Sequence, residues 1–195
     1  MQALADGYFI APATVTGWLA GAGAGALADD HPACREAVAA VEARIGALRR
    51  TGGTQPVDAF HRRLGHLMID ACGISRRADR LTAALAELEA LRHDFLGDLR
   101  LPDQDAGLDG ELEKALRLED FFGLADLMLR DALARQESCG AHFREEHQTP
   151  DGEALRDDDR FAHIAAWEHR PGGTPLRHSE PLHYRSVMPE LRSYG

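Results

Sequence analysis

The chain opens with an uncharged stretch and then changes to an amphipathic pattern. Residues 7–28 carry no charged side chain. After residue 30, apolar residues recur at intervals of three and four, the spacing of the buried face of an α-helix. This pattern predicts helices near residues 32–50, 56–73, 75–99 and 109–140. The positions predicted to be buried are Val38, Val41, Ile45, Leu48, Val57, Phe60, Leu64, Leu67, Met68, Ala71, Leu81, Leu85, Leu88, Phe95, Leu96 or Leu99, Leu112, Leu116, Phe122, Ala125, Leu129 and Ala132.

Residues that begin or end helices flank these segments. Pro32 suits the first turn of a helix, and Gly73 is expected to stop the second one. Ser75 and Asp109 are predicted to cap the N-termini of the third and fourth helices. Gly140 is expected to adopt the left-handed conformation that closes the fourth helix.

The remaining segments are predicted to be loops and strands. Residues 101–110, rich in Asp, Gly and Pro, predict a loop, and residues 150–152 predict a turn. Residues 161–169 and 176–184 predict two strands joined by a turn. A lone hairpin is marginally stable, so it is expected to lie on another element. The fold class is therefore mainly α: an antiparallel helical bundle of three long helices plus an N-terminal broken helix, with a C-terminal β-hairpin extension.

The uncharged opening stretch is long enough to be considered as a membrane span. Its Gly, Thr and Pro content disfavours insertion, and no basic residue precedes Arg35 as a signal peptide would require. We expect instead a helix, broken or bent at Pro12, that is apolar on nearly all sides because other protein surrounds it.

Length and charge narrow the functional class. The 195 residues suit one domain, or one domain with an extension. The net charge is −10, with Lys114 the single lysine, so no nucleic-acid partner is expected. Cys34, Cys72 and Cys139 lie far apart, which indicates neither a disulfide framework nor a metal centre and is typical of a reducing cytoplasm.

The histidines do not predict a metal site. His61 and His66 are five residues apart on one predicted helix and so fall on different faces. His163 and His169 could share one face of the hairpin with His178 or His183, but no cysteine or carboxylate set of suitable spacing accompanies them. We expect a solvated strand face.

Other catalytic patterns are equally weak. Ser138 lies near His142, but a polar residue is common at a helix end, and the chain has no nucleophile elbow. The glycines at 21, 23 and 25 lack the preceding strand of a phosphate-binding loop. The acidic runs 145–146 and 157–159 are typical of a solvated surface. No catalytic, cofactor-binding or metal-binding residue is predicted.

The densest polar segment spans residues 137–146. In an extended chain His142 and Arg144 point the same way, so a helix end and a charged strand face meet there. Glu137, Ser138, His142 and Arg144 are therefore candidate interface residues, and a structural ion-pair network is the alternative.

This segment also carries a resemblance to a known family. Residues 130–144, with Glu137-Ser138-Cys139-Gly140-Ala141-His142-Phe143-Arg144 at their end, resemble the Arg-x-Glu-Ser-Arg-Gly-Ala-His-x-Arg signature of the flavoprotein subunit of succinate dehydrogenase and fumarate reductase. Further similarities lie at both ends of the chain. They are Leu64-Gly65 with Met68, Gly73, Arg76 and Leu81; Asp157-Asp158-Asp159 followed by Trp167; the tail Met188-Pro189-Glu190-Leu191-Arg192-Ser193-Tyr194; and residues 1–7, which resemble the helix after that family's Gly-Ala-Asn-Arg-Leu-Gly segment.

The resemblance implies a domain organisation. Residues 1–28 would be the terminal helix of a flavin domain, 29–140 the helical bundle domain, and 141–195 an extension with the hairpin. The family's FAD-binding glycines, flavin-linked histidine, capping domain and dicarboxylate-binding residues would all lie upstream of Met1, so none is assigned here. Cys139 stands where the family commonly has Arg, which removes any salt bridge of that arginine. L-aspartate oxidase and adenylylsulfate reductase share the architecture.

Two functions from different classes follow. The first is the C-terminal part of an FAD-dependent succinate/fumarate oxidoreductase, whose partners would be the upstream flavin and capping domains, a membrane anchor and an iron–sulfur subunit. Its location would be the cytoplasmic inner face of the membrane. The second is a stand-alone helical interaction module. The chain alone is predicted to be colourless and inactive with succinate. Tyr8, Phe9, Ile10 and Trp18 are expected to fold back on the bundle, bury in a homodimer or be disordered.

Overall fold

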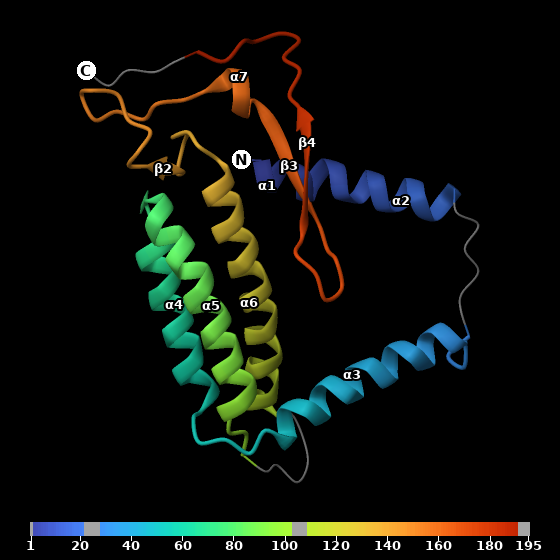
Figure 1. Cartoon of the computed structure of the whole chain (residues 1–195). Coiled ribbons are helices and arrows are strands. Elements are labelled where there is room, and N and C mark those ends of the chain that lie inside the picture. Colours follow the sequence, from blue (N-terminus) through green and yellow to red (C-terminus); the bar gives the residue numbers. More distant parts are fainter. Residues whose placement is uncertain (1, 22–27, 103–108, 191–195) are drawn as a thin grey trace. The chain divides into compact units, whose positions relative to one another are not determined.

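The protein is mainly helical, with a small antiparallel sheet near its C-terminus (Figure 1). This computed structural model describes residues 2–21, 28–102 and 109–190. Much of the glycine run, most of the predicted loop 101–110 and the last residues of the tail motif lie outside these ranges. The chain divides into two compact units, residues 1–44 and 45–195.

The first unit begins with a helix whose geometry changes before Pro12. Helix α1 (Gln2–Ala5) runs into a π-helical segment, η1 (Asp6–Ile10), and then into α2 (Ala11–Gly21). The amide of Ala11 donates to the carbonyl of Asp6, five residues back. Proline has no amide hydrogen and its ring crowds the carbonyl four residues earlier, so a wider turn relieves that clash. The predicted irregularity at Pro12 takes this form.

The apolar side chains of this helix are exposed. Tyr8 and Phe9 are each 75% exposed and Trp18 is 64% exposed. The expectation that the chain itself would cover or disorder them is therefore wrong for this structure, in which the helix is regular and these side chains face solvent. Within the described ranges, no helix combines the length and the apolar character needed to cross a membrane.

Helix α3 (Pro32–Arg50) has the predicted bounds but not the predicted buried stripe. Only Leu48, near its C-terminal end, is buried, whereas Val38 and Val41 are more than half exposed. Periodicity shows that a helix has an apolar face, but it does not show that another element covers that face.

Three helices of the second unit form the core. They are α4 (Val57–Cys72), α5 (Ala78–Asp98) and α6 (Gly110–Ala134), and each packs against the other two. The predicted bounds are close to these, and Asp109 caps α6 as predicted by accepting a hydrogen bond from the amide of Leu112 at 3.0 Å. The core residues are Leu48, Val57, Phe60, Leu64, Leu67, Ala71, Cys72, Leu81, Ala84, Leu88, Leu91, Phe95, Leu99, Ala115, Leu118, Phe122, Ala125, Leu129 and Ala132.

Several predicted details are wrong. Ser75 does not cap α5, because Ser75–Arg76 forms the short strand β1 and Arg77 holds the N-cap position. Helix α6 ends at Ala134, so Gly140 has the predicted positive φ of +59° in a later turn and not at the helix end. Leu96 is exposed, and Leu99 takes the buried place.

The segment before α4 is tied to the end of α5. The amide of Gly53 donates to the carbonyl of Leu99 at 2.9 Å, and the amide of Arg100 donates to the carbonyl of Gln55 at 2.8 Å. A Cβ on Gly53 would lie 2.0 Å from the carbonyl carbon of Asp98, so only glycine allows this approach. The Asp98 carboxylate accepts from the amide and hydroxyl of Thr54, and these hydrogen bonds lower the pKa of Asp98.

The C-terminal hairpin is the predicted one. Strands β3 (His163–Glu168) and β4 (Leu176–Pro181) pair antiparallel, and the short helix α7 (Asp158–Phe161) precedes them. The hairpin lies beside α6 (Figure 1). Trp167 and Arg177, directly opposite each other across the strands, both reach Asp131 of α6: Trp167 Nε1 donates to it at 3.0 Å, and Arg177 Nε lies 3.5 Å away.

Candidate functional site

The polar segment 137–146 folds against the end of α6 and the start of α5. The chain leaves α6 in extended form at Arg135, turns back through hydrogen bonds between Cys139 and His142, and forms strand β2 (Phe143–Arg144). Strand β2 pairs in parallel with β1, so Arg144 lies beside Arg76. A strand that sequence analysis did not foresee thus holds the candidate residues in place.

Ser138 is completely buried and its hydroxyl is fully used. Its Oγ accepts a hydrogen bond from the Arg144 amide at 2.8 Å and donates to the Arg144 carbonyl at 3.2 Å. Within the described residues, no hydrogen bond joins this hydroxyl to His142. Ser138 therefore fastens the backbone of β2 and does not have the geometry of a nucleophile next to its base.

Arg144 caps the C-terminal end of α6 from outside the helix. Its Nη1 donates to the carbonyls of Ala132 at 2.8 Å, Leu133 at 3.3 Å and Arg135 at 3.4 Å. The last carbonyls of a helix have no partner within it, and α6 has no basic residue in its own last turn. The buried guanidinium also pairs through Nε with Glu146 at 3.1 Å.

Glu137 joins three segments from a buried position. One oxygen, Oε1, pairs with Arg135 Nη2 at 2.6 Å, and the other accepts from the amide of Asp157 at 2.9 Å. The guanidinium of Arg135 also reaches the Phe161 carbonyl at the end of α7. Glu137 thus connects the end of α6 to the region that precedes the hairpin.

His142 is held as one neutral tautomer. Arg76 Nη1 lies 2.9 Å from His142 Nδ1 and can only donate, so Nδ1 accepts; His142 Nε2 lies 2.9 Å from the Arg135 carbonyl, which can only accept, so Nε2 donates. Burial, with further contributions from the positive charges of Arg76, Arg135 and Arg144, lowers the pKa of His142. His142 and Arg144 both reach the Arg135 carbonyl, which confirms that they point the same way.

The four predicted interface residues are therefore brought together, and Glu137, Ser138 and Arg144 are buried within the chain. Their hydrogen bonds and ion pairs are those of a structural network. Sequence analysis did not assign Arg76 or Arg135 to the site. Arg76 appears among the residues of the family resemblance, which is the one signal that could have pointed to it.

The remaining candidates are held in local contacts. His163 lies 2.8 Å from Arg177 and His178 lies 2.7 Å from Glu168, each through Nε2. Where the structure describes the chain, no group of three or more His, Cys, Asp or Glu residues could hold a metal ion. Of the acidic runs, Glu145 accepts from Ser75, Glu146 accepts from the Ala78 amide, and Asp157 caps α7.

The described residues do not fit a dinucleotide such as FAD. A dinucleotide is held by a glycine-rich turn between a strand and a helix at the edge of a parallel sheet. Among the described strands, parallel pairing is confined to β1 and β2, of two residues each, and the chain passes from β1 to α5 through Arg77 without a glycine. No step of flavin chemistry is assigned to residues of this chain.

Comparisons with known proteins agree with this picture. Residues 61–194 match the family model described as fumarate reductase flavoprotein C-term. The fumarate reductase flavoprotein subunit of Escherichia coli is 30% identical over 158 residues, which are 80% of this chain and 25% of that protein. A CoM/CoB-dependent fumarate reductase polypeptide of Methanothermobacter marburgensis is 32% identical over 121 residues, 62% of this chain and 22% of that protein.

Solved structures show the same fold. The flavoprotein subunit of E. coli quinol fumarate reductase superposes with a TM-score of 0.73 at 26% identity, covering 91% of this chain and 29% of that one. Mycobacterium smegmatis Sdh1 has a TM-score of 0.66 at 17% identity, covering 77% of this chain and 24% of that one. The chain spans about a quarter of the length of the curated relatives it matches. With the family model matching most of its length, the chain belongs to the fumarate reductase flavoprotein C-terminal family.

Proposed function

We propose that this chain acts as the C-terminal helical part of an FAD-dependent flavoprotein that interconverts succinate and fumarate. The observation that carries the proposal is the match of residues 61–194 to the C-terminal model of the fumarate reductase flavoprotein. In this role the chain supports the flavin and capping domains and offers part of the surface on which an iron–sulfur subunit docks. Catalysis, FAD binding and dicarboxylate binding belong to the other domains.

The arrangement proposed for α4, α5 and α6 is an antiparallel bundle. Two tertiary pairings support it. Gln55, just before α4, pairs with Leu99, just after α5, and β1, between α4 and α5, pairs with β2, which follows α6. The proposed domain limits are residues 1–28, 29–140 and 141–195, with the first segment covered by the flavin domain.

The proposed location is the cytoplasmic inner face of a membrane, where an anchor protein would hold the complex. The names of the solved relatives support a membrane-linked reaction, since one is a quinol fumarate reductase with menaquinol and another is Sdh1 with UQ1. For the alternative of a stand-alone interaction module, no contact among the described residues speaks specifically.

An affinity purification from the native organism, with a tag on this chain, tests the proposal. We expect a flavin-fluorescent polypeptide in the purified material, either the tagged polypeptide itself or a separate one, together with fumarate reductase or succinate dehydrogenase activity. The same 195 residues produced alone should be colourless between 400 and 500 nm, roughly the flavin absorption range, and inactive. A native preparation without flavin or activity would favour the interaction module.

A further inference from the structure

A hollow of about 350 Å³ lies between α4, α6 and the hairpin, next to the His142 network. Its wall is apolar on the side of α6 and β3, where Leu127, Met128 and Trp167 line it. Arg76 and His142 line the polar side. A mostly apolar hollow with a few convergent polar groups is the usual form of a small-ligand site.

Arg76 carries a positive charge that no carboxylate of the described residues balances. Its Nε donates to the Gly73 carbonyl at 2.9 Å and its Nη1 donates to His142, and both of these acceptors are neutral. Within the described part of the chain, the ion pairs of this region involve other arginines. A half-buried guanidinium without a counter-ion is costly, because burial removes part of its hydration.

The neighbouring charges leave this excess in place. Glu137 balances Arg135, and Glu146 balances Arg144. Asp131 also lines the hollow, but it is engaged by Trp167 at 3.0 Å and lies 3.5 Å from Arg177. After burial, the positive charge of Arg76 is among the causes that lower the pKa of His142, so the polar side of the hollow is electropositive.

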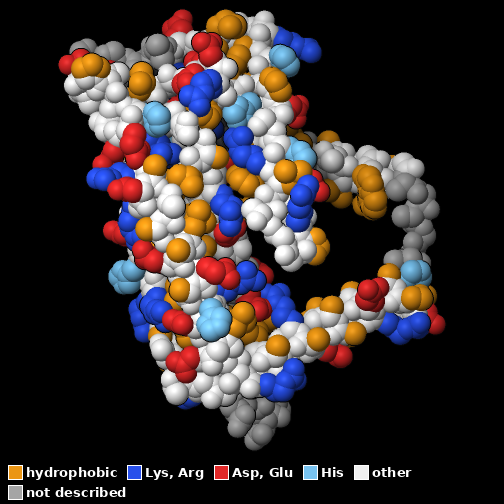
Figure 2. Space-filling view, viewed as in Figure 1, with side chains coloured by type: hydrophobic (Ala, Val, Ile, Leu, Met, Phe, Trp, Pro, Cys, Tyr) orange, Lys and Arg blue, Asp and Glu red, His pale blue; other side chains and the backbone are white. Residues whose placement is uncertain are grey.

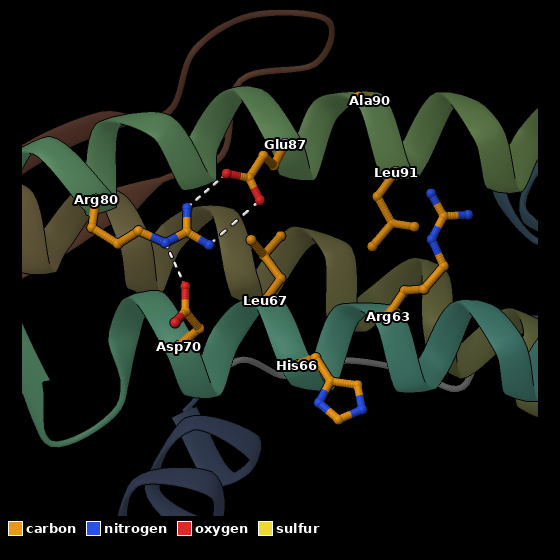
Figure 3. A pocket seen from close by; sticks show the side chains of 8 residues that line it. All are labelled: Arg63, His66, Leu67, Asp70, Arg80, Glu87, Ala90 and Leu91. Atoms are coloured by element: carbon orange, nitrogen blue, oxygen red, sulfur yellow. Dashed lines mark hydrogen bonds and ion pairs between the residues drawn. The ribbon is translucent and has the colours of Figure 1, made fainter.

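A groove between α4 and α5 shows the opposite situation (Figure 3). There the guanidinium of Arg80 lies between Asp70 and Glu87, which it contacts at 2.5 and 2.7 Å. Arg63, at the other end of the groove, pairs with Asp94 at 2.7 Å. Both arginines of that groove are matched by carboxylates of the chain itself, so it presents no unmet charge to a ligand.

We propose that the hollow beside Arg76 binds a small monocarboxylate with a short hydrocarbon body. The carboxylate would pair with the Arg76 guanidinium, which is suited to that group by its planar set of donors. The hydrocarbon body would lie against Leu127, Met128 and Trp167. One unbalanced arginine matches one carboxylate, and a second carboxylate on the ligand would meet Asp131.

Titration of the full chain with sodium butyrate tests this proposal, with NMR signals of the arginine and histidine side chains as the readout and sodium chloride holding the ionic strength constant. We expect saturable shifts of the Arg76 and His142 signals in the millimolar range. The negative ligand should also raise the pKa of His142 toward its ordinary value. Equal shifts on adding chloride alone, no saturation, or tighter binding of succinate than of butyrate would overturn the proposal.

Two pairs of variants locate the site. Arg76→Gln should weaken butyrate binding at least about tenfold, the effect of losing one charged hydrogen-bonded contact, whereas Arg63→Gln, which removes an arginine already paired, should leave it unchanged. Met128→Glu places a carboxylate in the hollow without touching the Arg76 hydrogen bonds and should abolish butyrate binding. Its isosteric control, Met128→Gln, should keep it. Butyrate binding to Met128→Glu with the affinity of the unchanged chain would refute the site even if Arg76→Gln does not fold.

Discussion

Replacing Arg144 by Met tests whether a residue outside α6 stabilises the end of that helix. Met preserves much of the volume of the arginine stem and removes the guanidinium, whose Nη1 reaches the carbonyls of Ala132, Leu133 and Arg135. The Arg144 side chain is only 3% exposed, so water cannot replace these bonds without opening the structure. The substitution therefore leaves helix carbonyls without a partner.

The magnitude follows from these contacts. Removing one partner of a buried charged group costs about 3–5 kcal/mol. The lower end applies here, because Glu146 is 40% exposed and can be hydrated again after it loses Arg144. We expect a loss of about 3 kcal/mol in the free energy of unfolding, which for a chain of this size lowers Tm by about 6–12 °C.

Urea unfolding followed by circular dichroism measures this loss, read from the midpoint at an unchanged m-value. Arg117→Met is the matched control, since Arg117 lies on the same helix, is 67% exposed and pairs only with Glu113 one turn away. It should change the free energy of unfolding by no more than about 0.5 kcal/mol. If the two variants lost the same small amount, Arg144 would not be the cap of α6.

Three further results are expected. Asp131→Ala should release the hairpin from α6 and shift the fluorescence of Trp167 to longer wavelength, measured with Trp18 replaced by Phe. Asp109→Ala should lower the free energy of unfolding by about 1 kcal/mol in the same urea assay, because the α6 cap is lost. Acid should destabilise the chain through His142: its folded pKa lies below the ordinary 6.5, so below about pH 6.5 the unfolded state takes up a proton that the folded state does not, until the folded pKa is reached.

Each of these expectations has a control. Asp131→Asn keeps an acceptor for the Trp167 indole, so its emission should stay closer to that of the unchanged chain. Asp109→Asn preserves the cap and loses only the charge that pairs with Arg49, so a loss equal to that of Asp109→Ala would point to the ion pair instead. His142→Gln should flatten the change in stability between about pH 7.5 and 5.5, the range bracketing the ordinary histidine pKa. A flattened profile for the exposed His66→Gln in place of His142→Gln would contradict the assignment.

The sequence predicted those parts of the fold that depend on local order. The core positions Phe60, Leu88 and Phe122 follow from helical periodicity, and Asp109 follows from the chemistry of helix caps. The charges on the surface give the same local signal: Figure 2 shows acidic and basic side chains interspersed over the helices of the second unit, as expected for solvated helix faces.

Features that depend on distant partners could not be predicted in this way. Strand β1 is two residues long, which is too short for an alternating pattern, and it exists because Phe143–Arg144 pairs with it. The stripe of α3 looks like that of a buried helix, but what covers such a stripe lies outside the pattern itself. The polar and convergent character of segment 137–146 is visible in the sequence. Its role in satisfying the α6 carbonyls required the three-dimensional positions of residues up to twelve apart.

The position of Arg144 in the chain has a consequence for synthesis. A ribosome releases α6 before the residue that completes its C-terminal end, so the last turn remains frayed until residues 138–144 have emerged and β2 has paired with β1. Glu137 then waits for the amide of Asp157, a further twenty residues along. A nascent chain stalled near residue 140 would therefore hold three helices whose ends are open to chaperones and proteases, whereas one stalled beyond residue 161 would have them closed.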